Sequence, residues 1–135
     1  MPYGLRRYAP LCGGRGACCG STAYAGHRPK TNSLLVDLVA DAGAVAVGKT
    51  NTPEFGAGAN TTNRVYGTTT NPFDTSKTCG GSSGGSGVAL AAGMLPLATG
   101  SDHGGSLRTP ARAPPPDTAT GCSPTLSPSR ADRPR

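Results

Sequence analysis

Two glycine turns rich in serine carry the side chains best suited to chemistry. The first covers residues 80–86 with the sequence GGSSGGS, and the second covers residues 100–106 with GSDHGGS. Glycine lets a backbone turn sharply and approach a ligand closely. A serine hydroxyl becomes a nucleophile when a base and N–H donors for an oxyanion lie beside it. The 24 residues from Ser82 to Ser106 leave room for one helix and one short strand, so we expect the two turns to lie side by side.

The sequence near the turns predicts the elements that position them. Between the turns we expect a helix over residues 84–94 and a short strand over 95–99, and after Ser106 a short helical turn. Residues 50–70 are dominated by Gly, Asn and Thr and predict a long loop, which often marks a functional segment. Residues 71–74, Asn-Pro-Phe-Asp, predict a turn.

A further helix and strand are predicted upstream. Asn32 or Ser33 can cap a helix over residues 34–42, whose leucines and valines form an apolar face. Gly43 suits the position after the helix, where a left-handed conformation is common. Residues 44–47, Ala-Val-Ala-Val, predict a short buried parallel strand. The expected unit is therefore a helix, a tight turn and a strand.

Four sequence blocks, taken in order, resemble the amidase signature family of serine hydrolases. They are GKTNTPEF at residues 48–55, GTTTNPFD at 67–74, GGSSGGS at 80–86 and GSDHGGSLRTPA at 100–111. The resemblance covers about residues 20–110. It implies an α/β fold in which helices cover a mixed β-sheet, of which this chain carries a part. The implied activity is hydrolysis of a carbon–nitrogen amide bond in a small-molecule amide substrate, without metal or cofactor.

The resemblance also implies roles for individual residues. Ser106 would be the nucleophile that forms an acyl ester, and Ser82, in a cis peptide, would relay a proton between Ser106 and a lysine. The oxyanion hole would consist of the N–H groups of four consecutive residues, His103, Gly104, Gly105 and Ser106. Three further side chains are expected to support the turns structurally, namely Ser83, Asp102 and Arg108.

The third catalytic member that the resemblance implies is not found. The family's base is a neutral lysine in a Val-Lys-Asp-like strand upstream of the GKTN block, and this chain has only Lys30, Lys49 and Lys77. None has that context, and Lys49 matches the GKTN lysine instead. We therefore assign no catalytic lysine and expect the chain to be truncated and inactive alone. We also expect the apolar faces of the helix over 34–42 and of the strands to be exposed, with poor folding and aggregation as the consequence.

Three alternative interpretations compete with a general amidase. A glutaminyl-tRNA amidotransferase subunit belongs to the same family, but its upstream block more often has an acidic residue after Met, unlike Thr-Pro-Glu at residues 52–54. Residues 43–50 match G-x-x-x-x-G-K-T, the pattern of a nucleotide-binding module, but a helical pattern precedes them where a strand is required. A triad of Asp102, His103 and Ser106 is disfavoured because adjacent Asp and His cannot line up toward the serine.

Charge and composition exclude several function classes. The net charge is +6, but residues 1–19 hold three arginines and no acid, and residues 111–135 hold four arginines and two aspartates. Residues 20–110 hold six basic and five acidic residues, without a basic stripe or interleaved aromatics, so we expect no nucleic-acid partner. Aromatic residues make up only 4% of the chain, a poor composition for an independent core.

The cysteines, the lack of a long apolar run and the composition of the flanks give the remaining expectations. Five cysteines, an odd number without metal-ligand spacing, argue against a disulfide framework or a zinc site. No apolar run reaches transmembrane length, so we expect no membrane partner and a cytoplasmic protein. We expect residues 20–110 to be the core, residues 1–19 to be unassigned and residues 111–135 to be disordered. Both flanks have the composition of high-GC DNA translated in a wrong frame.

Overall fold

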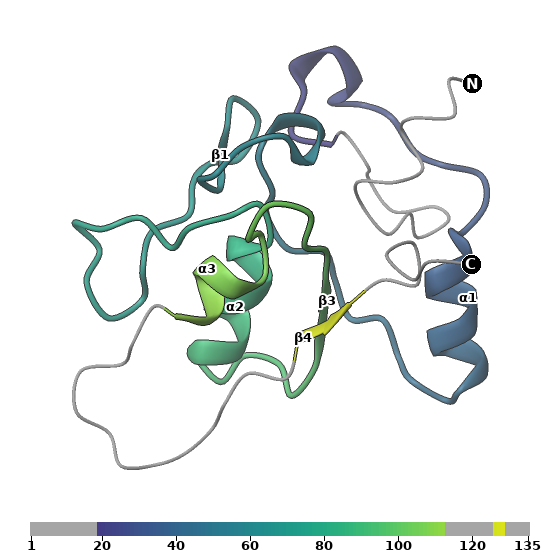
Figure 1. Ribbon diagram of the computed structural model, residues 1–135. Coiled ribbons are helices and arrows are strands. Elements are labelled where there is room, and N and C mark those ends of the chain that lie inside the picture. Colours follow the sequence, from purple (N-terminus) through teal and green to yellow (C-terminus); the bar gives the residue numbers. More distant parts are fainter. Residues whose placement is uncertain (1–18, 113–125, 129–135) are drawn as a thin grey trace.

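The computed structural model describes residues 19–112 and 126–128. Helix α2 (Gly84–Ala91) lies at the centre, with strand β3 (Ala98–Gly100) and helix α3 (Arg108–Ala111) packed against it (Figure 1). The loop between β3 and α3 passes the beginning of α2. Helix and strand thus combine into an α/β arrangement with a small open sheet, as the sequence predicts.

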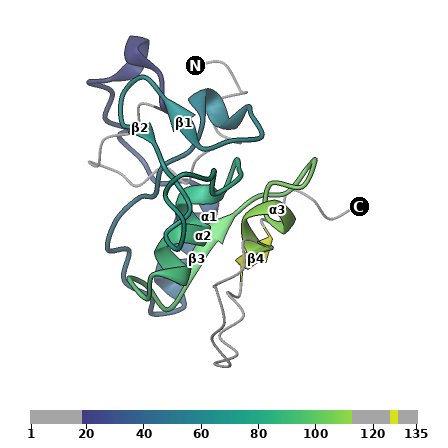
Figure 2. The same cartoon turned by 90° about the vertical axis from the view of Figure 1, so that its left-hand side faces the viewer.

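A short hairpin lies above α2 in both views (Figures 1 and 2). Strands β1 (Thr62–Asn63) and β2 (Gly67–Thr68) pair antiparallel, with Thr62 opposite Thr68. Two short 3-10 helices precede the hairpin, η2 (Thr22–Tyr24) and η3 (Glu54–Gly56). The segment 50–70 is therefore a loop that contains a two-stranded pair and a helical turn, which its polar composition did not indicate.

Helix α1 (Leu34–Asp41) forms where the sequence predicts a helix. It ends in a Schellman motif, because the N–H of Gly43 donates to Ala40 O at 2.8 Å and the N–H of Ala44 donates to Val39 O at 3.2 Å. Gly43 has φ +88°, which glycine adopts without steric cost. The predicted glycine stop is confirmed.

Helix α2 ends by the same device. The N–H of Gly93 donates to Leu90 O at 3.0 Å, and the N–H of Met94 donates to Ala89 O at 2.9 Å. Gly93 has φ +67°. The helix predicted over residues 84–94 therefore stops at Ala91, since the glycine closes its last turn before the apolar pattern ends.

The predicted strands differ from the observed ones. β3 begins three residues later than the expected strand over 95–99 and pairs parallel with β4 (Leu126–Pro128), register Ala98 opposite Leu126. Residues 44–47 form no strand, because no neighbouring strand among the described residues pairs with them. β4 lies in the tail for which disorder is predicted. The other residues of that tail beyond 112, and residues 1–18, lie outside the described residues.

Small and polar side chains make up the buried part of the described chain. The buried apolar residues are Cys79, Ala89, Ala98 and Leu107, and Thr61 is 1% exposed. By contrast, no residue of α1 is buried, and Leu34 is 69% exposed. The expected exposure of the α1 apolar face is therefore present. No helix in the described part of the chain is long and apolar enough to span a membrane.

The unequal exposure of two leucines gives a test of this packing. Leu34→Gln should raise the soluble fraction of the 135-residue chain and reduce its light scattering on heating, because it removes exposed apolar surface. Leu107→Gln, at a position only 9% exposed, should lower the soluble fraction because it buries an amide among apolar groups. Equal loss of solubility in both variants would show that α1 packs against the rest of the chain.

Candidate functional site

The two serine turns lie against each other at the beginning of α2. The N–H of Ser83 donates to Ser106 O at 3.2 Å. The Ser83 hydroxyl donates to Ser101 O at 3.2 Å and accepts from the N–H of Ser101 at 3.1 Å. One residue of the first turn thus holds both ends of the second turn, and the predicted juxtaposition of the turns is confirmed.

Ser82 and Ser106 have different surroundings. The peptide bond between Gly81 and Ser82 is cis, as the resemblance implies, and Ser82 is 7% exposed. Ser106 is partly exposed. Neither hydroxyl makes a hydrogen bond to any residue in the described part of the chain. Both hydroxyls therefore remain available for a substrate or for each other.

The Asp102 carboxylate brackets the second turn. One oxygen, Oδ1, accepts from the N–H of Gly105 at 2.9 Å and from Arg108 Nη2 at 2.9 Å. The other, Oδ2, accepts from the N–H groups of Leu107 and Arg108 and from Arg108 Nε, each at 3.1 Å. The Arg108 guanidinium, followed by these amides, holds the pKa of Asp102 well below its usual range. A carboxylate with five donors stays charged and rigid.

These bonds bear on two expectations about the second turn, the oxyanion hole and the disfavoured triad. The N–H of Gly105 is engaged by Asp102, so it does not point freely to an oxyanion. The N–H groups of His103, Gly104 and Ser106 make no hydrogen bond within the described residues. Asp102 binds Arg108 and main-chain amides instead of orienting His103, which agrees with setting the triad aside.

A threonine that sequence reasoning missed lies beneath the first turn. The Thr61 hydroxyl donates to Gly80 O at 2.9 Å and accepts from the N–H of Gly84 at 3.1 Å. Thr61 is 1% exposed. No spacing or periodicity marks it among the threonines of residues 50–70, because its partners lie 19 and 23 residues away.

A second missed contact links the GKTN block to the helix. The hydroxyls of Thr50 and Ser86 are 2.9 Å apart, and the Ser86 hydroxyl donates to Thr99 O at 2.8 Å. Since Ser86 donates its proton to Thr99, Thr50 is the donor in the hydroxyl pair. Three segments of the chain thus meet at Ser86, which is 4% exposed.

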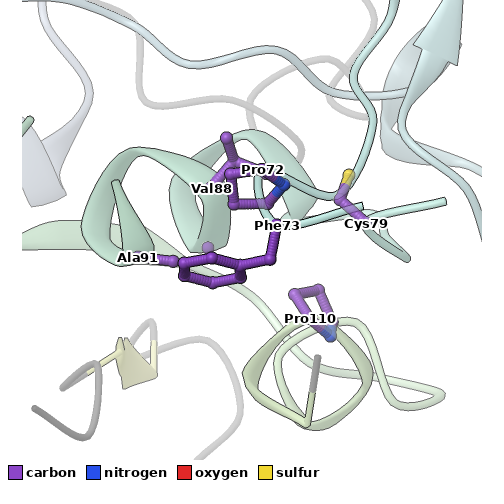
Figure 3. Close-up of a pocket in the computed structure, with 7 residues that line it drawn as sticks. Pro72, Phe73, Cys79, Val88, Ala91 and Pro110 are labelled. Carbon is purple, nitrogen blue, oxygen red and sulfur yellow. The ribbon is translucent and has the colours of Figure 1, made fainter. Parts of the chain in front are cut away.

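Behind the turns, α2 and α3 enclose a small apolar pocket. Figure 3 shows the Phe73 ring lying across α2, with Pro110 of α3 facing it. The lining of the pocket also includes Pro72, Cys79, Gly87, Val88 and Ala91. Its volume of about 10 Å³ holds no more than one water molecule. The pocket therefore does not accommodate an amide substrate.

Cys79, the cysteine that lines this pocket, is a buried free thiol. Its single S–H proton has two acceptors within reach, Thr69 O at 3.0 Å and Gly80 O at 3.3 Å from Sγ. Burial raises the pKa of Cys79, which keeps the thiol a donor and makes it a poor nucleophile. Within residues 19–112 and 126–128, no three His, Cys, Asp or Glu side chains gather as a metal site.

The nucleotide-binding pattern has the wrong structural context. Gly43 ends helix α1, residues 44–50 form neither strand nor helix, and Pro53 follows. A phosphate-binding loop requires a strand before it and a helix after it. The geometry therefore does not support a nucleotide site at residues 43–50.

The paired serine turns on an α/β scaffold, with an Asp–Arg bracket, define a candidate hydrolase site. The family model described as Amidase matches residues 13–113. The chain belongs to the amidase family. The match begins seven residues before the boundary predicted at residue 20.

The relatives of the chain are components of larger enzymes. It is 50% identical over 92 residues to the A subunit of the glutamyl-tRNA(Gln) amidotransferase from Chloroflexus aggregans, covering 68% of this chain and 19% of the relative. Identity to the corresponding protein of Methanosarcina acetivorans is 50% over 93 residues, covering 69% and 20%. The crystal structure of the Thermotoga maritima relative of the same name matches with a TM-score of 0.72 and 40% identity, covering 76% and 23%. The chain thus spans about a fifth of the length of the curated relatives it matches.

The hydrogen bonds of the Asp102 carboxylate predict that its contribution to the stability of the fold depends on pH. The test uses a chimera in which residues 20–110 replace the matching segment of the Thermotoga maritima protein. Because the pKa of Asp102 is lowered by folding, its stabilisation is present above the ordinary carboxyl pKa and is lost as pH falls. Asp102→Asn should therefore lower the thermal midpoint near neutral pH, and the difference from the parent should shrink toward about pH 2.5.

A second ion pair provides the control for this prediction. Asp74 Oδ2 and Lys77 Nζ are 2.8 Å apart, and hydrogen bonds from Lys77 and then Ser76 lower the Asp74 pKa to about 2. Both side chains are largely exposed, so Asp74→Asn should shift the midpoint little. A gap between parent and Asp102→Asn that stays constant with pH would show that the Asp102 charge is not what stabilises the turn.

Proposed function

We propose that the two serine turns form the nucleophile part of a site that hydrolyses carbon–nitrogen amide bonds. The observation that carries the proposal is the contact between Ser83 and the second turn, at Ser101 and Ser106. This contact brings the Ser82 turn and the Ser106 turn together in a chain of the amidase family. The substrate is a small-molecule amide.

In the proposed reaction, the Ser106 hydroxyl attacks the amide carbonyl carbon while the Ser82 hydroxyl accepts its proton and passes its own proton to a base. The N–H groups of His103, Gly104 and Ser106 hold the developing oxyanion, and Gly105 supports the turn through Asp102. The carbon–nitrogen bond then breaks, and ammonia or an amine leaves with a proton delivered through Ser82. Water finally hydrolyses the acyl ester to a carboxylate and regenerates the Ser106 hydroxyl.

The proton relay requires a base that this chain does not supply in the family's context. Lys77 is paired with Asp74, and Lys49 belongs to the GKTN block. We propose that the base comes from a segment outside residues 20–110. An unassisted serine hydroxyl is a weak nucleophile at neutral pH, so the 135-residue chain alone should be inactive.

A second candidate function is that of an amidotransferase component that acts with glutamyl-tRNA. The 50% identity to relatives of that name favours it over the general amidase that residues 52–54 suggested. This role would bring a tRNA into the assembly, contrary to the expectation of no nucleic-acid partner. Ammonia release from glutamine, but not from simple aliphatic amides, would favour the amidotransferase. A cytoplasmic location fits either role.

Substitutions in the chimera test the assigned roles. Ser106→Ala should abolish amide hydrolysis, and Ser82→Ala should lower kcat by roughly 10²–10⁴-fold, the contribution of a positioned proton-transfer group. Lys49→Ala should keep measurable activity, since Lys49 lies in the GKTN block rather than in a base position. Ammonia release measures all three. A Lys49→Ala chimera as inactive as Ser106→Ala would show that the lysines are wrongly aligned.

The chain by itself gives a separate test of the missing base. Residues 1–135 should neither hydrolyse amides nor react stoichiometrically with a serine-directed fluorophosphonate, because members of such a catalytic unit act together. Mass spectrometry of the treated chain locates any adduct. Cooperative thermal unfolding together with stoichiometric labelling at Ser106 would refute this prediction and imply a base within the chain.

A further inference from the structure

Helix α2 starts without help from the serine at its own N-cap. The first N–H groups of a helix have no intrahelical partner, and an N-cap serine commonly accepts one of them. Here the N-cap residue is Ser83, whose side chain makes no capping hydrogen bond because it is bonded to Ser101. The N–H of Gly84, the first residue of α2, is not within reach of an N-cap side chain, which accepts from the second or third helical residue. It therefore needs an acceptor from elsewhere in the chain.

Thr61 supplies that acceptor from a distant part of the chain. Its hydroxyl accepts from the N–H of Gly84 at 3.1 Å and donates to Gly80 O at 2.9 Å. These two residues flank the part of the first turn that contains Ser82. One buried hydroxyl thus joins the chain before Ser82 to the chain after it.

Thr61 is itself held in place by a main-chain hydrogen bond and by steric contacts. Its carbonyl accepts from the N–H of Thr69 at 2.9 Å, which continues the β1–β2 pairing. Steric contact adds to the hydrogen bonds, since a Cβ at Gly81 would lie 3.0 Å from Thr61 Oγ1 and a Cβ at Gly84 would collide with that oxygen. Thr61 therefore both packs against the first turn and bonds to it.

We propose that Thr61 is the positioning residue for Ser82, acting through Gly80 and Gly84 without touching the reacting atoms. The proposal rests on the proposed function, because the placement of Ser82 matters for a proton relay to Ser106. A displacement of about 1 Å in a catalytic group can cost on the order of 10²-fold in rate. Removing the Thr61 hydroxyl should accordingly lower kcat while leaving the Michaelis constant nearly unchanged.

The first arm of the test measures the turn directly by NMR of the chimera, in which glycine and serine carry the isotope label. Thr61→Val keeps the side-chain shape but removes the hydroxyl, so hydrogen exchange at the Gly84 amide should accelerate about tenfold or more. The amide resonance of Ser82, which does not contact the hydroxyl, should shift. Thr61→Ser should restore both values. Thr62→Val is the matched control, since among the described residues the Thr62 hydroxyl bonds only the exposed Thr68 hydroxyl.

The second arm measures kcat in the chimera. Thr61→Val should lower kcat at least about tenfold and Thr61→Ser should recover it, if Ser82 is displaced as inferred. An unprotected Gly84 amide in the parent chimera, a Ser82 resonance unmoved by Thr61→Val, or an unchanged kcat would each overturn the inference. A parent chimera without activity would count against the proposed function alone, and exchange and resonance data would still decide whether Thr61 fixes Ser82.

Discussion

Ser83 is the residue on which the arrangement of the two turns depends, because its main-chain N–H and its side-chain hydroxyl both bind the second turn. Its N–H binds Ser106 O, and its hydroxyl binds the N–H and carbonyl of Ser101. That commitment leaves the beginning of α2 without its usual cap. The hydroxyl of Thr61 accepts from a different donor, the N–H of Gly84, so the beginning of α2 is supported by a residue of the 50–70 segment and not by its own N-cap side chain.

Close approach of chain segments imposes a second constraint, which glycine meets by its size. A Cβ at Gly100 would lie 3.0 Å from Ser83 Oγ and collide with Leu107, and a Cβ at Gly85 would lie 2.5 Å from Asn51 N. Neither glycine has a left-handed φ, so conformational freedom is not the reason for glycine there. A side chain at either position would push the second turn or the GKTN block away from α2, and the hydrogen bonds of Ser83 would lengthen.

The sequence correctly predicted features that depend on adjacent residues. It did not predict features that depend on residues far away along the chain. The capping glycine at Gly43 correctly predicted the end of α1, because its φ and hydrogen bonds depend on adjacent residues. The short β-prone run at residues 44–47 predicted a buried strand, yet Val45 is 83% exposed and Val47 is 65% exposed. A strand forms only beside a partner. The same holds for the candidate site. The serine turns are visible in the sequence, whereas Thr61 is distinguished only by its contacts with residues 19 and 23 positions away.

The electrostatics of the second turn explain why an acidic residue is compatible with the proposed chemistry. A carboxylate four residues before Ser106 would, if unpaired, repel the negative charge that develops on the substrate oxygen. The Arg108 guanidinium binds both oxygens of Asp102, which offsets that charge and lowers the Asp102 pKa. The remaining acceptor capacity binds the amides of Gly105, Leu107 and Arg108. The turn thus gains a rigid bracket around Ser106 without an uncompensated charge, which is the condition under which free N–H groups nearby can stabilise an anion.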